Sequence, residues 1–423
     1  MVQKASQWLL AGIPFSLCFS QRLNGMVLLL YLLAVILQPD LPGRFRRAVR
    51  LRWVYPFAAL YALQAISLLW TADLHHGLDV LTTKSALLAL PVLIAMDGSV
   101  DGSSPGKAAA GLTAGCLLGL GWCLIYAGNG YLASGEPAIF FYHSLGRPLN
   151  QFNALYFSFY LFAALLFLKP ASGAHKILET KAFRSGAVLF LAAGLLLLSS
   201  RLFLLLAVGF FLFKLAESLL NKGMPGLQPL VWMVLVLSLA AGIWFTGFSR
   251  ERFSQVWHSN FGVLEQERFS WDTPFNGLTL RLLFLRLGLE TLEDHGAWLT
   301  GEGIGDARSE MNRMIVDHNL YHGNPYRGDT GYLGYNFHNQ FMELTVQSGL
   351  PALAAWIWLL VMAWRSAPSG DWRLPFLFFL VALILFALIE GVIERQRGVV
   401  FIAFFLSVFM KIDRYADQAR SNT

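Results

Sequence analysis

The chain has 423 residues, of which 56% are hydrophobic and only 14% are charged, and its mean hydropathy is +0.53. Soluble globular proteins carry about 25% charged residues, so this composition excludes an ordinary soluble protein. The formal net charge is +6, but no basic domain or nucleic-acid-binding motif accompanies it. We therefore expect no nucleic-acid partner.

Apolar runs of about 17–25 residues, the length that crosses the hydrocarbon core of a bilayer, recur along the sequence. In lipid such runs must be helical, because backbone groups have no water to bond. The sequence therefore predicts an all-α polytopic membrane protein with about 12 transmembrane helices. The predicted spans are Ala5–Ser20, Leu23–Gln38, Trp53–Trp70, Leu78–Met96, Ala108–Tyr126, Phe152–Leu168, Gly186–Ser200, Leu202–Leu220, Leu230–Gly247, Leu350–Trp364, Leu374–Ile389 and Val399–Met410. The weakest is Leu78–Met96, because it contains Asp79 and Lys84.

Basic residues predict the orientation of these spans, because cytoplasmic loops are enriched in Lys and Arg. By the order of the spans, the basic clusters all fall on one side. They are Arg44 to Arg52, Lys169 to Arg184, Arg365 with Arg373, and Lys411 to Arg420. That side is predicted to be cytoplasmic and in contact with anionic membrane lipids. The long loop Phe248–Gln347 then lies outside, which in a bacterium means the periplasm or the cell exterior.

The pattern divides the chain into three parts. We expect residues 1–247 to form an N-terminal transmembrane bundle, residues 248–347 a periplasmic loop domain with amphipathic helices, and residues 348–423 the C-terminal transmembrane helices and a cytoplasmic tail. The loop contains eight Arg and no Lys. Guanidinium groups stay charged and match phosphate oxygens two at a time. An arginine-only loop at a membrane surface therefore indicates a site for a lipid-linked phosphate or diphosphate.

Individual arginines differ in how well they suit such a site. Arg201 stands at the outer end of the seventh predicted span, where it either snorkels to lipid or binds an anion. Arg281 and Arg286 lie in Leu278–Leu292, a leucine-rich stretch with helical periodicity that is expected to lie along the membrane surface. Arg286 can pair with Glu290 at i+4, whereas Arg281 has no acidic residue at i+3 or i+4 and is the better candidate.

Several other patterns carry no clear chemistry. No Walker A sequence is present, so nothing suggests a nucleotide as energy source. The glycines from Gly301 to Gly305 lack the spacing of a dinucleotide fingerprint and indicate either a tight turn or a close backbone approach to a ligand. Asp317, His318 and His322 lack the HExxH arrangement of a zinc site. We therefore predict neither a metal nor an organic cofactor.

His338 is the candidate catalytic base. Histidine is the side chain most easily placed to accept a proton near neutral pH, although a single histidine is often structural. Asn339 follows it, and the predicted span that begins near Leu350 comes next. This places His338 near the exterior surface of the membrane that the chain is predicted to span.

The segment around His338 also resembles a known family. His338-Asn339, separated by nine residues from Gly349-Leu350-Pro351, is similar to the motif of the O-antigen ligase and O-antigen polymerase superfamily. Members of that superfamily are GT-C-like membrane glycosyltransferases with one large periplasmic loop that ends in a His-Asn motif. Three further features agree with the pattern: Ser200-Arg201, the helix that carries Arg281, and the Trp298 to Gly305 turn. Ala352 departs from it, which bears on the choice between ligase and polymerase.

The resemblance implies an O-antigen ligase, which completes lipopolysaccharide. The donor would be a glycan on undecaprenyl diphosphate and the acceptor a sugar hydroxyl of lipid A–core oligosaccharide. His338 would act as general base, and Arg201 and Arg281 would bind the diphosphate in an inverting, metal-independent transfer. Arg147, Arg286 and Asn339 are candidate helpers; Arg147, among the aromatic residues of a shorter outer loop, could equally be a lipid anchor.

Three alternatives remain open. An O-antigen polymerase would extend the glycan on its lipid carrier, and a protein O-oligosaccharyltransferase would transfer it to a protein. A transporter, from a different class, would show paired polar residues within the spans and broken helices. Asp79 and Lys84 are the main residues of that kind.

Overall fold

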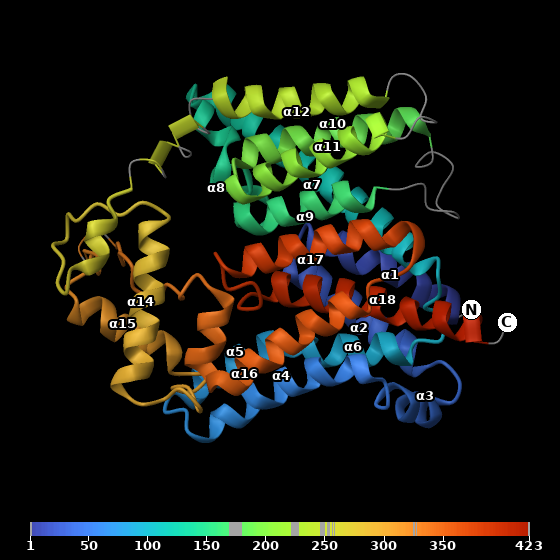
Figure 1. Cartoon of the computed structure of the whole chain (residues 1–423), viewed down its shortest axis with the longest axis horizontal. Helices are drawn as coiled ribbons and strands as arrows, with labels where there is room; N and C mark the ends of the chain where they lie inside the picture. Colours follow the sequence, from blue (N-terminus) through green and yellow to red (C-terminus); the bar gives the residue numbers. More distant parts are fainter. Residues whose placement is uncertain are drawn as a thin grey trace.

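The computed structural model describes residues 2–168, 180–220, 228–245, 250–251, 254–255, 257, 259–324, 326 and 328–421. Within these ranges the regular secondary structure is helical, apart from one isolated antiparallel bridge between Asn324 and Asp329. The long helices lie side by side, and a smaller helical unit caps one end of them (Figure 1). The prediction of an all-α chain is therefore confirmed for the described residues.

Each of the twelve predicted spans coincides with a helix or a helix pair. These are α1 Val2–Leu17, α2 Gln21–Ile36, α4 Tyr55–Ile66, α5 Leu74–Lys84 with α6 Ala86–Met96, α7 Ser104–Ser134, α9 Ala154–Phe167, α10 Lys181–Leu198, α11 Arg201–Leu220, α12 Gln228–Phe245, α16 Gln340–Arg365, α17 Arg373–Ala387 and α18 Gln396–Ser421. The connecting helices include α3 Leu41–Ala48, α8 Tyr142–Leu145, α14 Thr279–Asp294 and α15 Ala307–Asp317.

Fewer helices than twelve meet a strict criterion for crossing a membrane. Among the described residues, five are long and apolar enough: Leu74–Met96, α7, α11, α16, and Gly370–Ala387 around α17. Counting the bent pair of α2 and α3 would make six, and α9, α10 and α12 are apolar but shorter. The chain thus has the architecture of a polytopic membrane protein, and the span predicted to be weakest is among the five.

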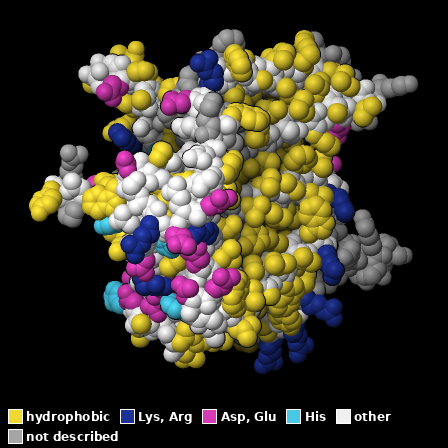
Figure 2. All heavy atoms as spheres, turned by 60° about the vertical axis from the view of Figure 1, so that its left-hand side comes forward, with side chains coloured by type: hydrophobic (Ala, Val, Ile, Leu, Met, Phe, Trp, Pro, Cys, Tyr) yellow, Lys and Arg dark blue, Asp and Glu magenta, His cyan; other side chains and the backbone are white. Residues whose placement is uncertain are grey.

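The surface agrees with this architecture. In Figure 2 a broad apolar belt covers the bundle, charged side chains of both signs gather on the capping unit, and Lys and Arg line the opposite edge. Inside the belt, Val399–Met410 of α18 is buried on all sides. A helix that is apolar all round belongs in the interior, and α18 packs there against α6 (Figure 1).

The capping unit, here called the loop domain (residues 259–338), has a hydrophobic core of its own. Leu283, Phe284 and Leu287 of α14 pack there with Met311 and Ile315 of α15. Helix α14 runs across the direction of the long helices (Figure 1). The apolar face of α14, which we expected to rest on the membrane, is largely covered by this core. The periodicity identified the face correctly, but the same pattern serves lipid and protein contacts.

A glycine-rich turn attaches the loop domain to the bundle. The amide of Glu302 donates to the Val346 carbonyl, 2.7 Å away, and that of Leu350 donates to the Trp298 carbonyl, 2.8 Å away. Helix α16 is kinked here at Gly349, whose φ of 74° and close approach to the Leu299 carbonyl leave no room for a β-carbon. The glycines from 301 to 305 therefore form a tight packing turn, the simpler of the two predicted roles.

Candidate functional site

His338 lies where the loop domain meets α16. Its backbone has a positive φ of 47°, a conformation in which His is enriched among non-glycine residues. The amide of His338 donates to Oδ1 of Asn336, 3.2 Å away. The next residue, Asn339, is the N-cap of α16, and its Oδ1 accepts from the Met342 amide. The His-Asn pair thus turns the chain sharply into α16, and the imidazole projects at the start of that helix.

Three neighbours fix the imidazole ring. It stacks on Phe284 with an interplanar angle of 10°, and Tyr335 meets it edge-on. Nδ1 of His338 lies 3.3 Å from Oε2 of Glu390. A carboxylate can only accept, so the neutral ring carries its proton on Nδ1 and keeps a lone pair on Nε2. With 21% of its side chain exposed, His338 has the tautomer and the access that a general base requires.

The sequence analysis missed Glu390. Its carboxyl is only 3% exposed and belongs to the segment that connects α17 to α18, here called the 388–395 loop. Burial tends to raise the pKa of this carboxyl, but the hydrogen bond from His338 and the positive charges of Arg281 and Arg395 hold the pKa below its usual value. Glu390 is therefore ionised, and it can stabilise the imidazolium that forms when His338 takes a proton.

Arg281 and Arg201 converge on one residue, Gly277. A β-carbon built on Gly277 would lie 3.2 Å from Nη1 of Arg281 and 3.3 Å from Nη2 of Arg201. The two guanidinium groups are therefore no farther apart than the sum of these distances. Because Arg201 begins α11 and Arg281 lies in the first turns of α14, a contact across the bundle and the loop domain brings them together.

The 388–395 loop links these arginines to His338. Nε of Arg281 donates to the Ile389 carbonyl, 2.8 Å away, and Nη1 donates to the Gly277 carbonyl, 2.6 Å away. The residue after Ile389 is Glu390, the partner of His338. On the other side, the Asn339 amide nitrogen donates to the Leu388 carbonyl, 3.1 Å away. Asn339 thus holds the loop, and a role of Asn339 as a helper in the chemistry stays a prediction.

Two of the five N–H groups of Arg281 are used in the described structure, both by backbone carbonyls. The planar fork of a guanidinium carries five donors in total. Three donors of Arg281 therefore remain for a ligand. Since two arginines face the same glycine, an anion at this point would meet two positive charges, and the attraction of guanidinium for phosphate oxygens is strong.

A buried polar network supports the 388–395 loop from below. Nζ of Lys84, which is fully buried, lies 2.8 Å from Oε1 of Glu394 and 2.7 Å from Oε1 of Gln347. Gln340 donates to Glu394 and accepts from the Ile393 amide. The charge that weakened the fourth predicted span is therefore a paired group with a structural role. A buried ion pair of this kind is expensive to break, so it holds the loop in one position.

The two remaining candidate arginines have different surroundings. Arg286 pairs with Glu290 at 2.5 Å and donates to the Leu264 and Gln266 carbonyls within the loop domain. These contacts are internal, so nothing in them connects Arg286 to the imidazole. Arg147 is exposed in a 3₁₀ turn before α9. Their role as helpers stays a prediction.

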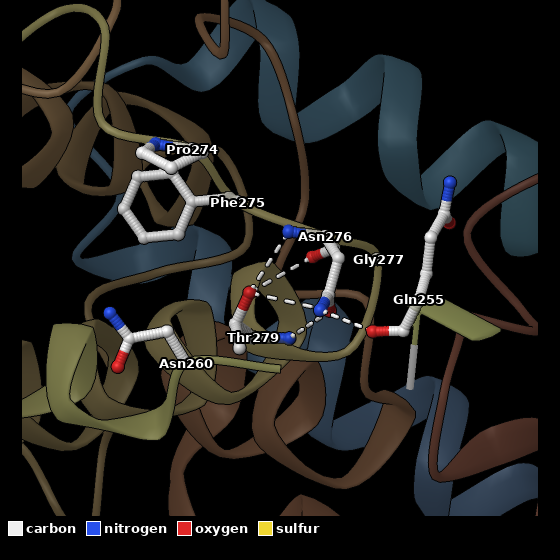
Figure 3. Close-up of a pocket in the computed structure, with 7 residues that line it drawn as sticks. All are labelled: Gln255, Asn260, Pro274, Phe275, Asn276, Gly277 and Thr279. Carbon is white, nitrogen blue, oxygen red and sulfur yellow. Dashed lines mark hydrogen bonds between the residues drawn. The ribbon is translucent and has the colours of Figure 1, made fainter. Parts of the chain in front are cut away.

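A pocket opens beside the two converging arginines. It has a volume of about 440 Å³ and is lined by Gln255, Asn260, Pro274, Phe275, Asn276, Gly277 and Thr279. Figure 3 shows these residues around the turn that leads into α14. Gly277 forms part of its wall and is also the residue against which Arg201 and Arg281 lie. The pocket therefore borders the anion site, which the sequence could not indicate.

The other histidines of the loop domain are engaged elsewhere. Nε2 of His318 lies 3.1 Å from Glu290, and its Nδ1 lies 2.6 Å from the Glu267 carbonyl. Nδ1 of His322 lies 3.0 Å from the Leu320 carbonyl. Across the described ranges, no three His, Cys, Asp or Glu residues form a group that could hold a metal ion.

No protein-family model matches the chain, and no curated protein sequence matches it. The geometry of the site indicates which chemistry it can perform. A histidine with a carboxylate partner can take a proton, and two arginines nearby can hold an anionic group. A pocket without charged lining residues adjoins them. This combination suits a reaction in which a hydroxyl is deprotonated and an anionic group departs.

Proposed function

We propose that this protein is a membrane glycosyltransferase of the O-antigen ligase type. It transfers a glycan from undecaprenyl diphosphate to lipid A–core oligosaccharide and so completes lipopolysaccharide. The observation that carries the proposal is the 388–395 loop: Glu390 contacts the base His338, and the adjacent Ile389 contacts Arg281, which shares Gly277 with Arg201.

The chemistry is a single displacement at the anomeric carbon. Nε2 of His338 takes the proton from the acceptor hydroxyl, and the oxygen attacks the anomeric carbon. The bond from that carbon to the diphosphate oxygen breaks, and undecaprenyl diphosphate leaves with the electron pair. Glu390 stabilises the imidazolium, and Arg201 with Arg281 stabilises the charge that grows on the departing diphosphate. Attack opposite to the leaving group inverts the configuration.

The proposed placement has the loop domain in the periplasm of a bacterium and about twelve helices in the inner membrane. Two observations support it. The basic helix α3 and the loop domain lie at opposite ends of the bundle (Figure 1), and an apolar belt separates them (Figure 2). Cytoplasmic loops are the ones enriched in Lys and Arg. The site, at the loop-domain end, then faces the compartment in which flipped lipid-linked glycans are present.

Deletion of the gene in its native host, followed by electrophoresis of lipopolysaccharide, tests the proposal. Loss of all long-chain bands, with polymer accumulating on the lipid carrier, is the expected result. A core carrying one repeat unit would instead assign the chain as a polymerase. Unchanged lipopolysaccharide would contradict both assignments and would favour transfer to a protein or a transport function.

A further inference from the structure

The pocket beside Gly277 has lining groups that suit a neutral, hydroxylated ligand. None of the seven described residues that line it is charged. The Gln255 side chain and the amide nitrogen of Asn260 make no hydrogen bond to any described residue. These groups are available to a ligand, whereas Asn276 and Thr279 bond to each other and to the backbone around them (Figure 3).

The volume and the lining of the pocket suit a sugar ring. Its volume of about 440 Å³ lies within the range of about 300–1,000 Å³ that is typical of small-molecule sites. Phe275 and Pro274 lie together on one side, whereas Asn260 and Gln255 lie at opposite ends of the group (Figure 3). A pyranose has hydroxyls around its edge and C–H groups on its faces, so it matches a lining that is part apolar and part amide.

The neighbouring arginines define which ring this would be. A diphosphate bound by Arg201 and Arg281 would lie against Gly277, which is part of the pocket wall. The first sugar of a lipid-linked donor is bonded directly to the diphosphate. We propose that the pocket lined by Gln255, Asn260 and Phe275 binds this first, uncharged sugar and so orients its anomeric carbon toward His338. This inference rests on the proposed function.

Binding measurements with two probes separate the sugar from the diphosphate. The probes are undecaprenyl diphosphate and undecaprenyl diphosphate bearing one N-acetylhexosamine, each titrated against the full chain in lipid nanodiscs. The test variant combines Gln255→Leu with Asn260→Ser. Serine keeps an acceptor for the Gly262 amide, which Asn260 now caps at 3.1 Å, but has no amide nitrogen. Gln266→Leu, an exposed glutamine outside the pocket lining, is the matched control.

The double variant is expected to weaken binding of the sugar-bearing probe by about tenfold, since each lost hydrogen bond contributes modestly. Its affinity for bare undecaprenyl diphosphate should stay at the wild-type value, as should both affinities of Gln266→Leu. Arg201→Ala should weaken both probes. An equal loss for the two probes, or no loss for either, would overturn the sugar assignment while leaving the diphosphate site in place. A wild-type protein that binds neither probe would overturn the proposed function as well.

Discussion

One cluster of buried polar and charged groups lies near α3, and another lies where the loop domain meets α16. Helix α3 and the loop domain are at opposite ends of the bundle (Figure 1), and the two clusters differ in how completely their hydrogen bonds are satisfied. At the end that carries α3, Arg44 donates to four backbone carbonyls. Nearby, Lys411 donates to the Ile94 and Asp97 carbonyls. Burial tends to raise the pKa of Asp97, but hydrogen bonds from Ser6 and other donors hold it below its usual value.

The cluster at the loop-domain end has hydrogen-bond donors and an acceptor that could bond to a ligand. Among the described residues, nothing bonds to Nε2 of His338 or to three of the N–H groups of Arg281, and a pocket adjoins the two arginines. Buried polar groups whose hydrogen bonds are all made favour one structure. Buried polar groups that lack partners cost stability unless a ligand bonds to them. The comparison therefore assigns the α3 end to stability and the loop-domain end to chemistry. Each prediction below tests one side of that assignment.

The largest effect is expected for His338→Ala. Removing a general base typically lowers the rate by about 10²–10⁴-fold, and the partly exposed ring should be dispensable for folding. Glycan transfer by the purified variant, measured with a lipid-linked donor and lipid A–core, checks this. His295→Ala, which alters an exposed histidine paired with Glu302, is the control and should keep its activity. Near-wild-type transfer by His338→Ala would remove the imidazole from the mechanism.

Arg281→Lys tests whether the geometry of the cation matters. Lysine keeps the charge but cannot contact the Ile389 and Gly277 carbonyls and a diphosphate together. We expect kcat/KM to fall by about 10²-fold, the size of the loss of one donor to a developing anion. The control is Arg313→Lys. Arg313 pairs with Glu310 and Asp317 within the loop domain, so this variant should retain activity. Full activity of Arg281→Lys would mean that charge alone suffices there.

Glu390→Gln should have a smaller effect. A glutamine can accept the Nδ1–H hydrogen bond of His338, but it cannot stabilise the imidazolium by charge. A charge-assisted hydrogen bond contributes about 1.5–3 kcal/mol, so we expect a rate loss of roughly 10–100-fold. A transfer rate equal to that of the wild type would contradict the assigned role of Glu390.

Stability should respond to pH through the same carboxyl. Its pKa in the folded state lies below the usual value of 4.5, so ionisation of Glu390 stabilises the fold at pH values above the unfolded-state pKa. The contribution is lost as the pH falls through the folded-state pKa. The difference in Tm between wild type and Glu390→Gln should therefore be constant near neutrality and change only below pH 4.5. A change that begins at higher pH would contradict this linkage.

The sequence predicted the separate parts of the site better than their connections. His338 was identified by the His-Asn motif, and Arg281 by the lack of an acidic residue at i+3 or i+4. Glu390 did not, because it is one acidic residue in a short segment between apolar runs. Its contact with His338 spans 52 residues and depends on how α16, α17 and α18 pack. The sequence signal that could have indicated Glu390 was an acidic residue in a loop predicted to lie on the same side of the membrane as His338.

The same limit applies to the remainder of the fold. Hydropathy located helices at all twelve predicted spans, but it could not tell which helices face lipid. Lys84 counted against its span because its partner Glu394 is 310 residues away. The convergence of the two arginines required the chain around Gly277 to meet Arg201 on α11. Long-range pairing of this kind leaves no periodic trace in one sequence, whereas burial of a helix face does.

The smallest effect on activity, and a clear effect on stability, is expected for Arg44→Met at the α3 end. Methionine preserves much of the apolar stem but removes the guanidinium donor from four carbonyls, of which only that of Val35 keeps another donor among the described residues, the Gln38 amide. A buried unsatisfied group costs about 1–3 kcal/mol. The Tm in detergent should fall while the transfer rate of the folded protein stays at the wild-type value. Arg47→Met is the matched control, because Arg47 makes only an exposed pair with Asp40 and exposed pairs contribute little. If Arg44→Met lowered the rate without lowering the Tm, this would contradict the assignment of the α3 end to stability and of the loop-domain end to chemistry.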